Sequence, residues 1–374
     1  MSDLYDPNKK EAGGPEPGPA TPPPGDGLPP GTPPGPVPDP VPDSEPERIP
    51  SAGQVNGTAP DRIRIGLWGA PRSGKTTYLA ALPIAAMQYQ RHNEGSWNIS
   101  GMTQEANAFL TQGMDLLTRQ RAFPEATMGV QEMAWSVQGP EEKGRLGFRT
   151  RRPNFVLDIQ DAAGEAFGRD HPQQAQHVGQ LARSHGLIDL FDPLGDGTRA
   201  TESFAYLQST LTQLTARVRD RDELVDGKLP HHVSVCISMF DHPDIFRPAV
   251  EAGWVTQDTV GSQLPRVPRD KSENFFQWMC DEFRGSNARL VRDALYAYFE
   301  PRRISCYASS AVGFRLNPQQ VFDYGDYVQP VEVAGKPHFR TSPVPIDVLE
   351  PLIDLESRIH RDRGRGGWLG GKRK

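Results

Sequence analysis

The sequence predicts an α/β protein with a mostly parallel six-stranded sheet, helices on both faces and helical insertions. Two observations lead to this fold class. Apolar runs of strand length alternate with longer amphipathic runs of helical period over most of the chain. A glycine-rich loop stands between the first apolar run and the first helical run. Parallel strands end at one edge of their sheet, so polar residues that follow the strands are expected to meet there.

The composition predicts three parts. The segment 1–60 contains 18 of the 37 prolines and few aliphatic residues, so we expect a disordered Pro/Gly-rich leader. Residues 61–360 are expected to form one folded domain. Residues 361–374 form a basic Gly-rich tail, which we expect to be solvated. A contact of this tail with nucleic acid or an anionic membrane surface is the alternative.

The first predicted strand, Ile63–Trp68, leads into a match to G-x-x-x-x-G-K-[ST], the Walker A phosphate loop. A helix is expected to follow, and Pro83 to end or kink it. Backbone N–H groups at such a helix start bind phosphate. Lys75 is expected to reach the β- and γ-phosphates and Thr76 to ligate Mg²⁺. The motif predicts a P-loop NTPase three-layer sandwich, in which the nucleotide contacts Gly69, Ala70, Pro71, Arg72, Ser73, Gly74, Lys75, Thr76 and Thr77.

The remaining elements follow from periodicity and turn residues. The predicted strands are Glu132–Val137 and Leu146–Thr150 as an antiparallel pair, then Phe155–Ile159, Gly186–Phe191, His232–Ile237 and Arg303–Tyr307. The predicted helices are Glu105–Arg121, Ser203–Val218, Glu273–Phe283, Ala288–Phe299 and Ile346–His360.

Two predicted strands end in residues suited to a triphosphate and its metal. Asp161 and Gly164 form Asp-x-x-Gly directly after Phe155–Ile159. A carboxylate there can hold Mg²⁺ through water, and a glycine N–H can approach the γ-phosphate. Farther along, Asp241 follows the strand His232–Ile237, and Ser310-Ala311 follow Arg303–Tyr307.

This order of motifs resembles a Ras-like GTPase of the TRAFAC class. The resemblance implies that Asp241 pairs with guanine N1 and N2, and that a Ser310-Ala311 backbone N–H meets guanine O6. Ser238 and Met239 stand where that family has Asn and Lys, so guanine is favoured and adenine stays open. The long spacers resemble the bacterial double-GTPase and related GTPase-like proteins of multigene conflict or signalling systems.

The resemblance also implies two switch residues. Thr127 is the candidate threonine that senses Mg²⁺ and the γ-phosphate, with Thr103 and Thr118 as alternatives. Glu165 stands where Ras-like enzymes place a water-orienting Gln. Its charge would face phosphate oxygens. We therefore expect slow hydrolysis, or completion of the site by a residue in trans.

The expected function is a nucleotide-dependent switch that binds Mg²⁺ and GTP, hydrolyses it slowly to GDP and acts through an effector or neighbouring-gene protein partner. The alternative is a non-hydrolysing or ATP-binding P-loop scaffold. Three cysteines without metal spacing and the absence of a long apolar run predict a cytoplasmic protein without a transmembrane segment. His171, His177 and His185 are expected to be surface or partner contacts.

Overall fold

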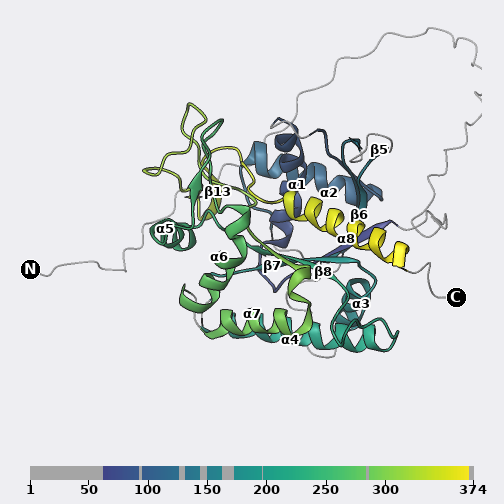
Figure 1. Ribbon diagram of the computed structural model, residues 1–374. Helices are drawn as coiled ribbons and strands as arrows, with labels where there is room; N and C mark the ends of the chain where they lie inside the picture. The colour runs from purple at the N-terminus through teal and green to yellow at the C-terminus, as the bar shows by residue number, and fades with distance from the viewer. Residues whose placement is uncertain are drawn as a thin grey trace, which may run out of the picture. The chain divides into compact units, whose positions relative to one another are not determined.

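The computed structural model describes residues 62–91, 95–125, 131–143, 150–161, 172–195, 197–283 and 286–369 (Figure 1). By its internal contacts the chain divides into Met1–Pro50 and Ser51–Lys374, and every described residue belongs to the second unit. The predicted leader, residues 1–60, lies outside the described residues.

The described domain is built on a seven-stranded sheet in the order β11-β8-β7-β1-β6-β3-β2. Five strands run parallel: β11 (Ile304–Ala308), β8 (His232–Ile237), β7 (Gly186–Phe191), β1 (Ile63–Trp68) and β6 (Asn154–Asp161). Next to β6, β3 (Gln131–Gln138) is antiparallel, and β2 (Asn98–Gly101) pairs antiparallel with β3. The predicted α/β class with a mostly parallel sheet is confirmed, with one strand more than expected.

The prediction that Glu132–Val137 pairs with Leu146–Thr150 is wrong. β3 pairs along its whole length with β6, from Gln131 opposite Asp161 to Gln138 opposite Asn154, and its other edge is taken by β2. Residues 144–149 lie outside the described part, and Thr150–Arg151 form β5, which pairs with β4 (Glu142–Lys143). Trp135 and Val137 are buried in the core beside β6, so burial of the apolar side of β3 selects this pairing.

The first helix, α1 (Lys75–Arg91), runs through Pro83, so this residue, expected to kink or end the helix, does not end it. Proline removes one helical hydrogen bond and crowds the preceding turn. Leu79 and Leu82 before it, and Ala85 and Ala86 after it, are buried against the sheet. Their packing keeps the helix continuous across the proline.

The other helices are α2 (Gln104–Asp115), α3 (Pro172–Leu181), α4 (Gly197–Arg219), α5 (Pro243–Glu251), α6 (Ser272–Trp278), α7 (Ser286–Tyr298) and α8 (Glu350–Leu369). Two of them continue as π-helical turns: α2 into η1 (Leu116–Gln120) and α6 into η4 (Met279–Phe283). The closing helix α8 starts four residues later than predicted and crosses the predicted domain boundary at residue 360. Among described elements, β2, α3, α5 and the hairpins β9-β10 (Thr256–Gln257, Pro265–Arg266) and β12-β13 (Pro330–Val333, Lys336–Phe339) were not anticipated.

Helices cover both faces of the sheet, because alternate residues of its central strands are buried on opposite sides. Leu187 of β7 belongs to a cluster with α3, α4, α6 and α7, whereas its neighbour Ile188 belongs to a cluster with α1, α2 and α8. Figure 1 shows the same division, with α4 and α7 on one side and α1 and α8 on the other. Strands buried on both faces are typical of parallel sheets in α/β proteins.

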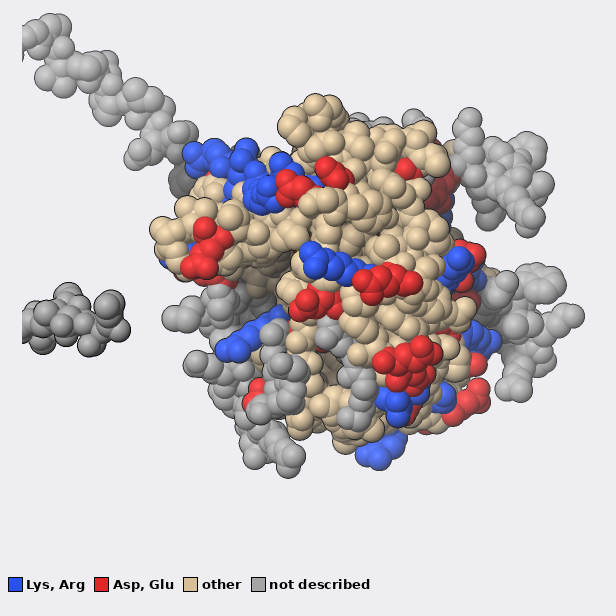
Figure 2. Space-filling view, turned by 90° about the vertical axis from the view of Figure 1, so that its left-hand side faces the viewer, with Lys and Arg blue, Asp and Glu red and all other residues tan. Residues whose placement is uncertain are grey.

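Basic and acidic side chains are interspersed on the face shown in Figure 2 and do not form a patch of one sign there. Among the described helices, none combines the length and the apolar character that a membrane crossing requires.

Candidate functional site

The loop between β1 and α1 requires glycine at two positions. Gly69 has φ of +147°, and a Cβ added to it would lie 2.7 Å from Ser73 Oγ and 2.8 Å from Leu190 O. Gly74 has φ of +89°, where a side chain would meet open space but would strain the backbone. The first glycine therefore allows close packing against β7, and the second allows the turn into α1.

Lys75 lies across this loop. Its Nζ donates hydrogen bonds to the carbonyl oxygens of Gly69, at 3.0 Å, and Ala70, at 3.1 Å. Ser73 is fully buried, and its hydroxyl has no partner among the described residues. An ammonium held on two neutral acceptors and an unpartnered hydroxyl both suit a bound anion, which offers stronger acceptors. The loop therefore fits a phosphate group.

The predicted metal ligands lie on adjacent elements. Thr76 is half-buried in the first turn of α1. Gly66 of β1 pairs with Asp158 of β6, so Asp161, three residues farther, ends its strand beside Gly69. Within the described ranges, no group of three or more His, Cys, Asp or Glu side chains could hold a metal ion. Thr127, Gly164 and Glu165 lie outside these ranges, so the contacts predicted for them stay predictions.

Asp189 on β7 is a site residue that sequence reasoning missed. It pairs in register with Trp68, and only 4% of its surface is exposed. Burial raises the pKa of its carboxyl group to about 7, although the positive charge of Lys75 acts in the opposite direction. The signal was an acid in the middle of the apolar run Gly186–Phe191. In a strand buried on both faces, such a residue is an exception that points to function.

His177 was expected to be a surface or partner contact, and its burial shows that the surface alternative is wrong. It lies on α3, is 4% exposed, and neither ring nitrogen has a partner in the described part of the chain. Burial lowers the pKa of its imidazole to about 4, and the charge of Lys75 acts in the same direction. His185 is half-buried and accepts a hydrogen bond from the Arg64 N–H at 3.0 Å, while His171 lies outside the described residues.

At the other end of the same sheet edge, Asp241 and Ser310 meet directly. Asp241 is 8% exposed and accepts a hydrogen bond from the Ser310 hydroxyl, which itself accepts the Gly313 N–H at 2.7 Å. Burial raises the pKa of Asp241 to about 6, and the Ser310 hydrogen bond lowers it. The Ser310 N–H donates to Ile346 O at 2.9 Å. Of the two predicted N–H groups, only that of Ala311 lacks a backbone acceptor in the described residues.

Ser238 and Met239 stand where the resembled family has Asn and Lys, and they make different contacts. Ser238 donates from its backbone N–H, at 2.8 Å, and from its hydroxyl, at 3.1 Å, to the carbonyl of Phe191. These bonds join the end of β8 to the end of β7. Met239 has φ of +58°, and the next residue, Phe240, is fully buried. The backbone before Asp241 is therefore fixed by packing and by hydrogen bonds.

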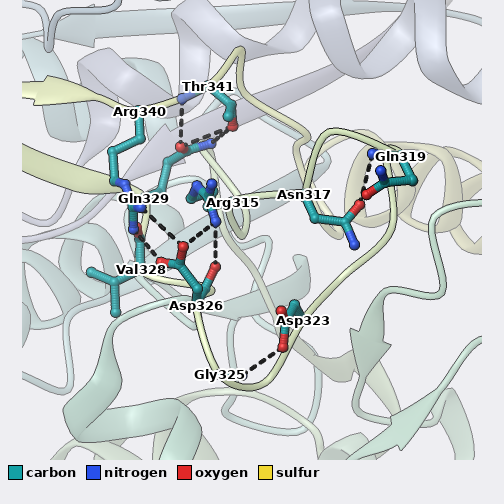
Figure 3. A network of polar contacts seen from close by, with 10 residues as sticks. All are labelled: Arg315, Asn317, Gln319, Asp323, Gly325, Asp326, Val328, Gln329, Arg340 and Thr341. Carbon is teal, nitrogen blue, oxygen red and sulfur yellow. Dashed lines mark hydrogen bonds and ion pairs between the residues drawn. The ribbon is translucent and has the colours of Figure 1, made fainter.

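The segment between Ser310 and Ile346 supports this end of the site (Figure 3). Asp326 accepts hydrogen bonds from the guanidinium groups of Arg315 and Arg340, and Gln329 bonds to the Thr341 N–H at 3.0 Å. The segment closes on itself where the Ile346 N–H donates to Ser310 O at 2.8 Å. This polar network fixes the long connection that leads the chain back to Ser310.

The fold and the site thus define an α/β protein whose sheet edge carries a glycine-rich loop, a lysine and buried carboxylates. No known family model matches the chain. A comparison with curated proteins gave no match either. What the chain binds must therefore be inferred from its own residues.

Proposed function

We propose that the chain is a P-loop NTPase of the Ras-like class that binds Mg²⁺ and GTP and acts as a nucleotide-dependent switch. The observation that carries the proposal is the position of Lys75, whose Nζ bridges Gly69 O and Ala70 O in a loop between a parallel strand and a helix start. In such loops the lysine and the helix N-terminus bind phosphate together.

In the proposed complex, Lys75 exchanges its two carbonyl acceptors for phosphate oxygens. The Ser73 hydroxyl, buried and unpartnered among the described residues, lies inside the same loop. Thr76 and Asp161 would hold Mg²⁺, which neutralises part of the triphosphate charge when bound. Arg72 is exposed, so its side chain is not held inside the loop.

Asp241 and Ala311 are the proposed base-reading groups. A carboxylate pairs well with the N1–H and N2–H₂ donors of guanine and would be left unpaired by adenine. Ser310 Oγ holds the Asp241 carboxylate in place and is held in turn by the Gly313 N–H. The Asn-Lys pair is absent, so we expect modest affinity for the nucleotide.

Slow hydrolysis and a protein partner complete the proposal. Glu165 in place of a Gln places a negative charge near the phosphates, which does not favour fast turnover. Loss of the γ-phosphate would release the segments around Thr127 and Gly164, and a partner would read that change.

The first experiment measures nucleotide content and turnover. Purified chain is denatured, the released nucleotide is identified by chromatography, and phosphate release from GTP and ATP is followed with and without Mg²⁺. Bound GDP or GTP and slow Mg²⁺-dependent phosphate release are expected. Preferential binding of ATP, or no nucleotide binding at all, would contradict the proposal.

The second candidate function is an ATP-binding or non-hydrolysing scaffold. It is favoured by Ser238, whose N–H and hydroxyl are both used by Phe191 O and so are not free to support guanine as an Asn would. Tight ATP binding without phosphate release in the same assay would select this function.

A further inference from the structure

A cavity of about 270 Å³ opens beside the Gly69–Thr76 loop, between the end of β7, the first part of α4 and the η4–α7 segment. It reaches the loop at Gly69 and Ala70 only. Lys75, Asp241 and Ser310 do not line it, so it shares only Gly69 and Ala70 with the nucleotide site proposed above. Its size is near the lower end for small-molecule pockets.

Asp189 lines this cavity and stands apart from the other buried carboxylates. Asp241 accepts a hydrogen bond from Ser310, and Glu356 accepts one from Arg151. The carboxylate of Asp189 is as deeply buried, yet among the described residues only the charge of Lys75 favours its ionised form, and no hydrogen bond does. A buried carboxylate without a donor is costly, and a bound donor would remove that cost.

The rest of the lining sets the shape and chemistry of an occupant. Phe191, Leu207, Phe283 and Val291 supply apolar walls. Tyr206, from α4, and Asn287, from α7, are half-buried and add polar groups. Ligand pockets commonly combine such walls with a few polar groups that fix orientation. One deep anionic acceptor in an apolar cavity matches a ligand with one cationic donor.

We propose that this cavity binds a small molecule that joins an apolar, ring-sized body to a protonated amine, with the amine on Asp189. Two of the three Lys75 N–H groups donate to Gly69 O and Ala70 O, and the charge of Lys75 acts on Asp189 without a hydrogen bond. Because Gly69 and Ala70 both line the cavity and hold Lys75, an occupant would also contact the loop that positions this lysine. Binding in the cavity is therefore expected to change the affinity of the loop for its own ligand, and the reverse.

The test uses the full-length chain and two probes of equal size, 2-phenylethylamine and 2-phenylethanol. Saturation-transfer NMR titrations are run at about pH 8, where an acid with a pKa of about 7 is mostly ionised. The amine is expected to bind at least about tenfold more tightly than the alcohol, the scale of one charge-assisted hydrogen bond. Equal affinities, or no binding of the amine up to about 10 mM, a weak limit even for fragments, would overturn the proposal.

Three variants locate the site. Asp189→Asn keeps the side-chain volume and should abolish the preference for the amine. Asp192→Asn is the matched control, because Asp192 lines the same cavity but already accepts the Leu194 N–H at 2.8 Å, so the preference should persist. Ala200→Leu fills the cavity from α4 and should remove binding of both probes.

Persistence of the preference in Asp189→Asn, or its loss in Asp192→Asn alone, would overturn the assignment to Asp189. Unchanged probe binding in Ala200→Leu would place the probes elsewhere. Thermal unfolding of each variant checks folding, and the two-probe comparison in the unmodified chain stands even where a variant fails to fold. The titrations use chain from which any bound nucleotide has been removed, and none is added, so their outcome is independent of the GTP proposal.

Discussion

At the scale of single residues, Lys75 and Arg72 share one loop but occupy different surroundings. Lys75 bonds to two carbonyl oxygens of the loop, whereas Arg72 is exposed and has φ of +67°. We predict that Lys75→Ala abolishes triphosphate binding, because the loop loses the cation proposed to contact the β- and γ-phosphates. Arg72→Ala is the matched control and should retain affinity within a few-fold. Isothermal titration with GTP measures both, and unchanged affinity in Lys75→Ala would remove the phosphate-loop assignment.

Asp241 decides the predicted choice of base. Replacement by Asn turns one acceptor into a donor, which opposes guanine N1–H and suits xanthine, whose C2 carries an oxygen. We predict that Asp241→Asn weakens GTP binding by roughly 2–4 kcal/mol and gains affinity for xanthosine triphosphate. Competition binding with GTP, ATP and xanthosine triphosphate measures the change. If the variant keeps the nucleotide preferences of the unmodified chain, Asp241 only supports Ser310 and does not select the base.

Asp189 makes stability depend on pH. Its folded-state pKa is raised to about 7 by burial, so between about pH 4 and pH 7 the folded chain holds a proton that the unfolded chain has released. The free energy of unfolding therefore falls as pH rises through this window. His177 acts in the opposite direction, because its pKa is lowered to about 4 in the folded chain. As pH falls toward 4, the unfolded chain binds this proton first, and the free energy of unfolding decreases.

The variant Asp189→Asn isolates the carboxyl contribution, since both proteins keep His177. We predict that the stability of Asp189→Asn relative to the unmodified chain increases with pH, by up to about 1.4 kcal/mol for each unit between about pH 4 and pH 7. Urea unfolding at a series of pH values measures this difference. A difference that is constant with pH would mean that the carboxyl group titrates normally.

At the scale of elements, strongly periodic segments were predicted and short or polar ones were not. β7 and β8 occupy the predicted residues, because each is a mostly apolar run of strand length. β2 is a four-residue strand with alternately exposed positions, recognisable only from its pairing with β3. Pro83 was expected to kink or end the helix because the local sequence does not show that the residues on either side of it pack in the core.

Pro83 offers a test of how far core packing offsets the unfavourable effect of a proline inside a helix. Proline in a helix interior is unfavourable relative to alanine by about 3 kcal/mol, and Pro83 is half-buried, so part of this is offset by packing of its ring. We predict that Pro83→Ala raises the free energy of unfolding by roughly 1–2 kcal/mol, measured by urea denaturation. A loss of stability instead would show that the ring or a bend at this position is required by the core.

At the scale of the whole molecule, the composition separates residues 1–60 from the described domain. Few aliphatic residues and many prolines predict that this leader contributes no packing energy. Deletion of residues 1–60 should therefore leave the melting temperature nearly unchanged. A decrease of more than about 3 °C, the scale of 1 kcal/mol in a domain of this size, would mean that the leader packs on the fold.

The sequence by itself determined the α/β class, the central strands and the loop from Gly69 to Thr76, because these depend on residues that are neighbours along the chain. It also placed Asp241 and Ser310 at the ends of strands, although not their hydrogen bond. The tertiary structure alone decided that β3 pairs with β6, that His177 is buried and that Asp189 faces a cavity. Burial and pairing depend on residues far apart in the chain, and no local pattern records which of them will meet.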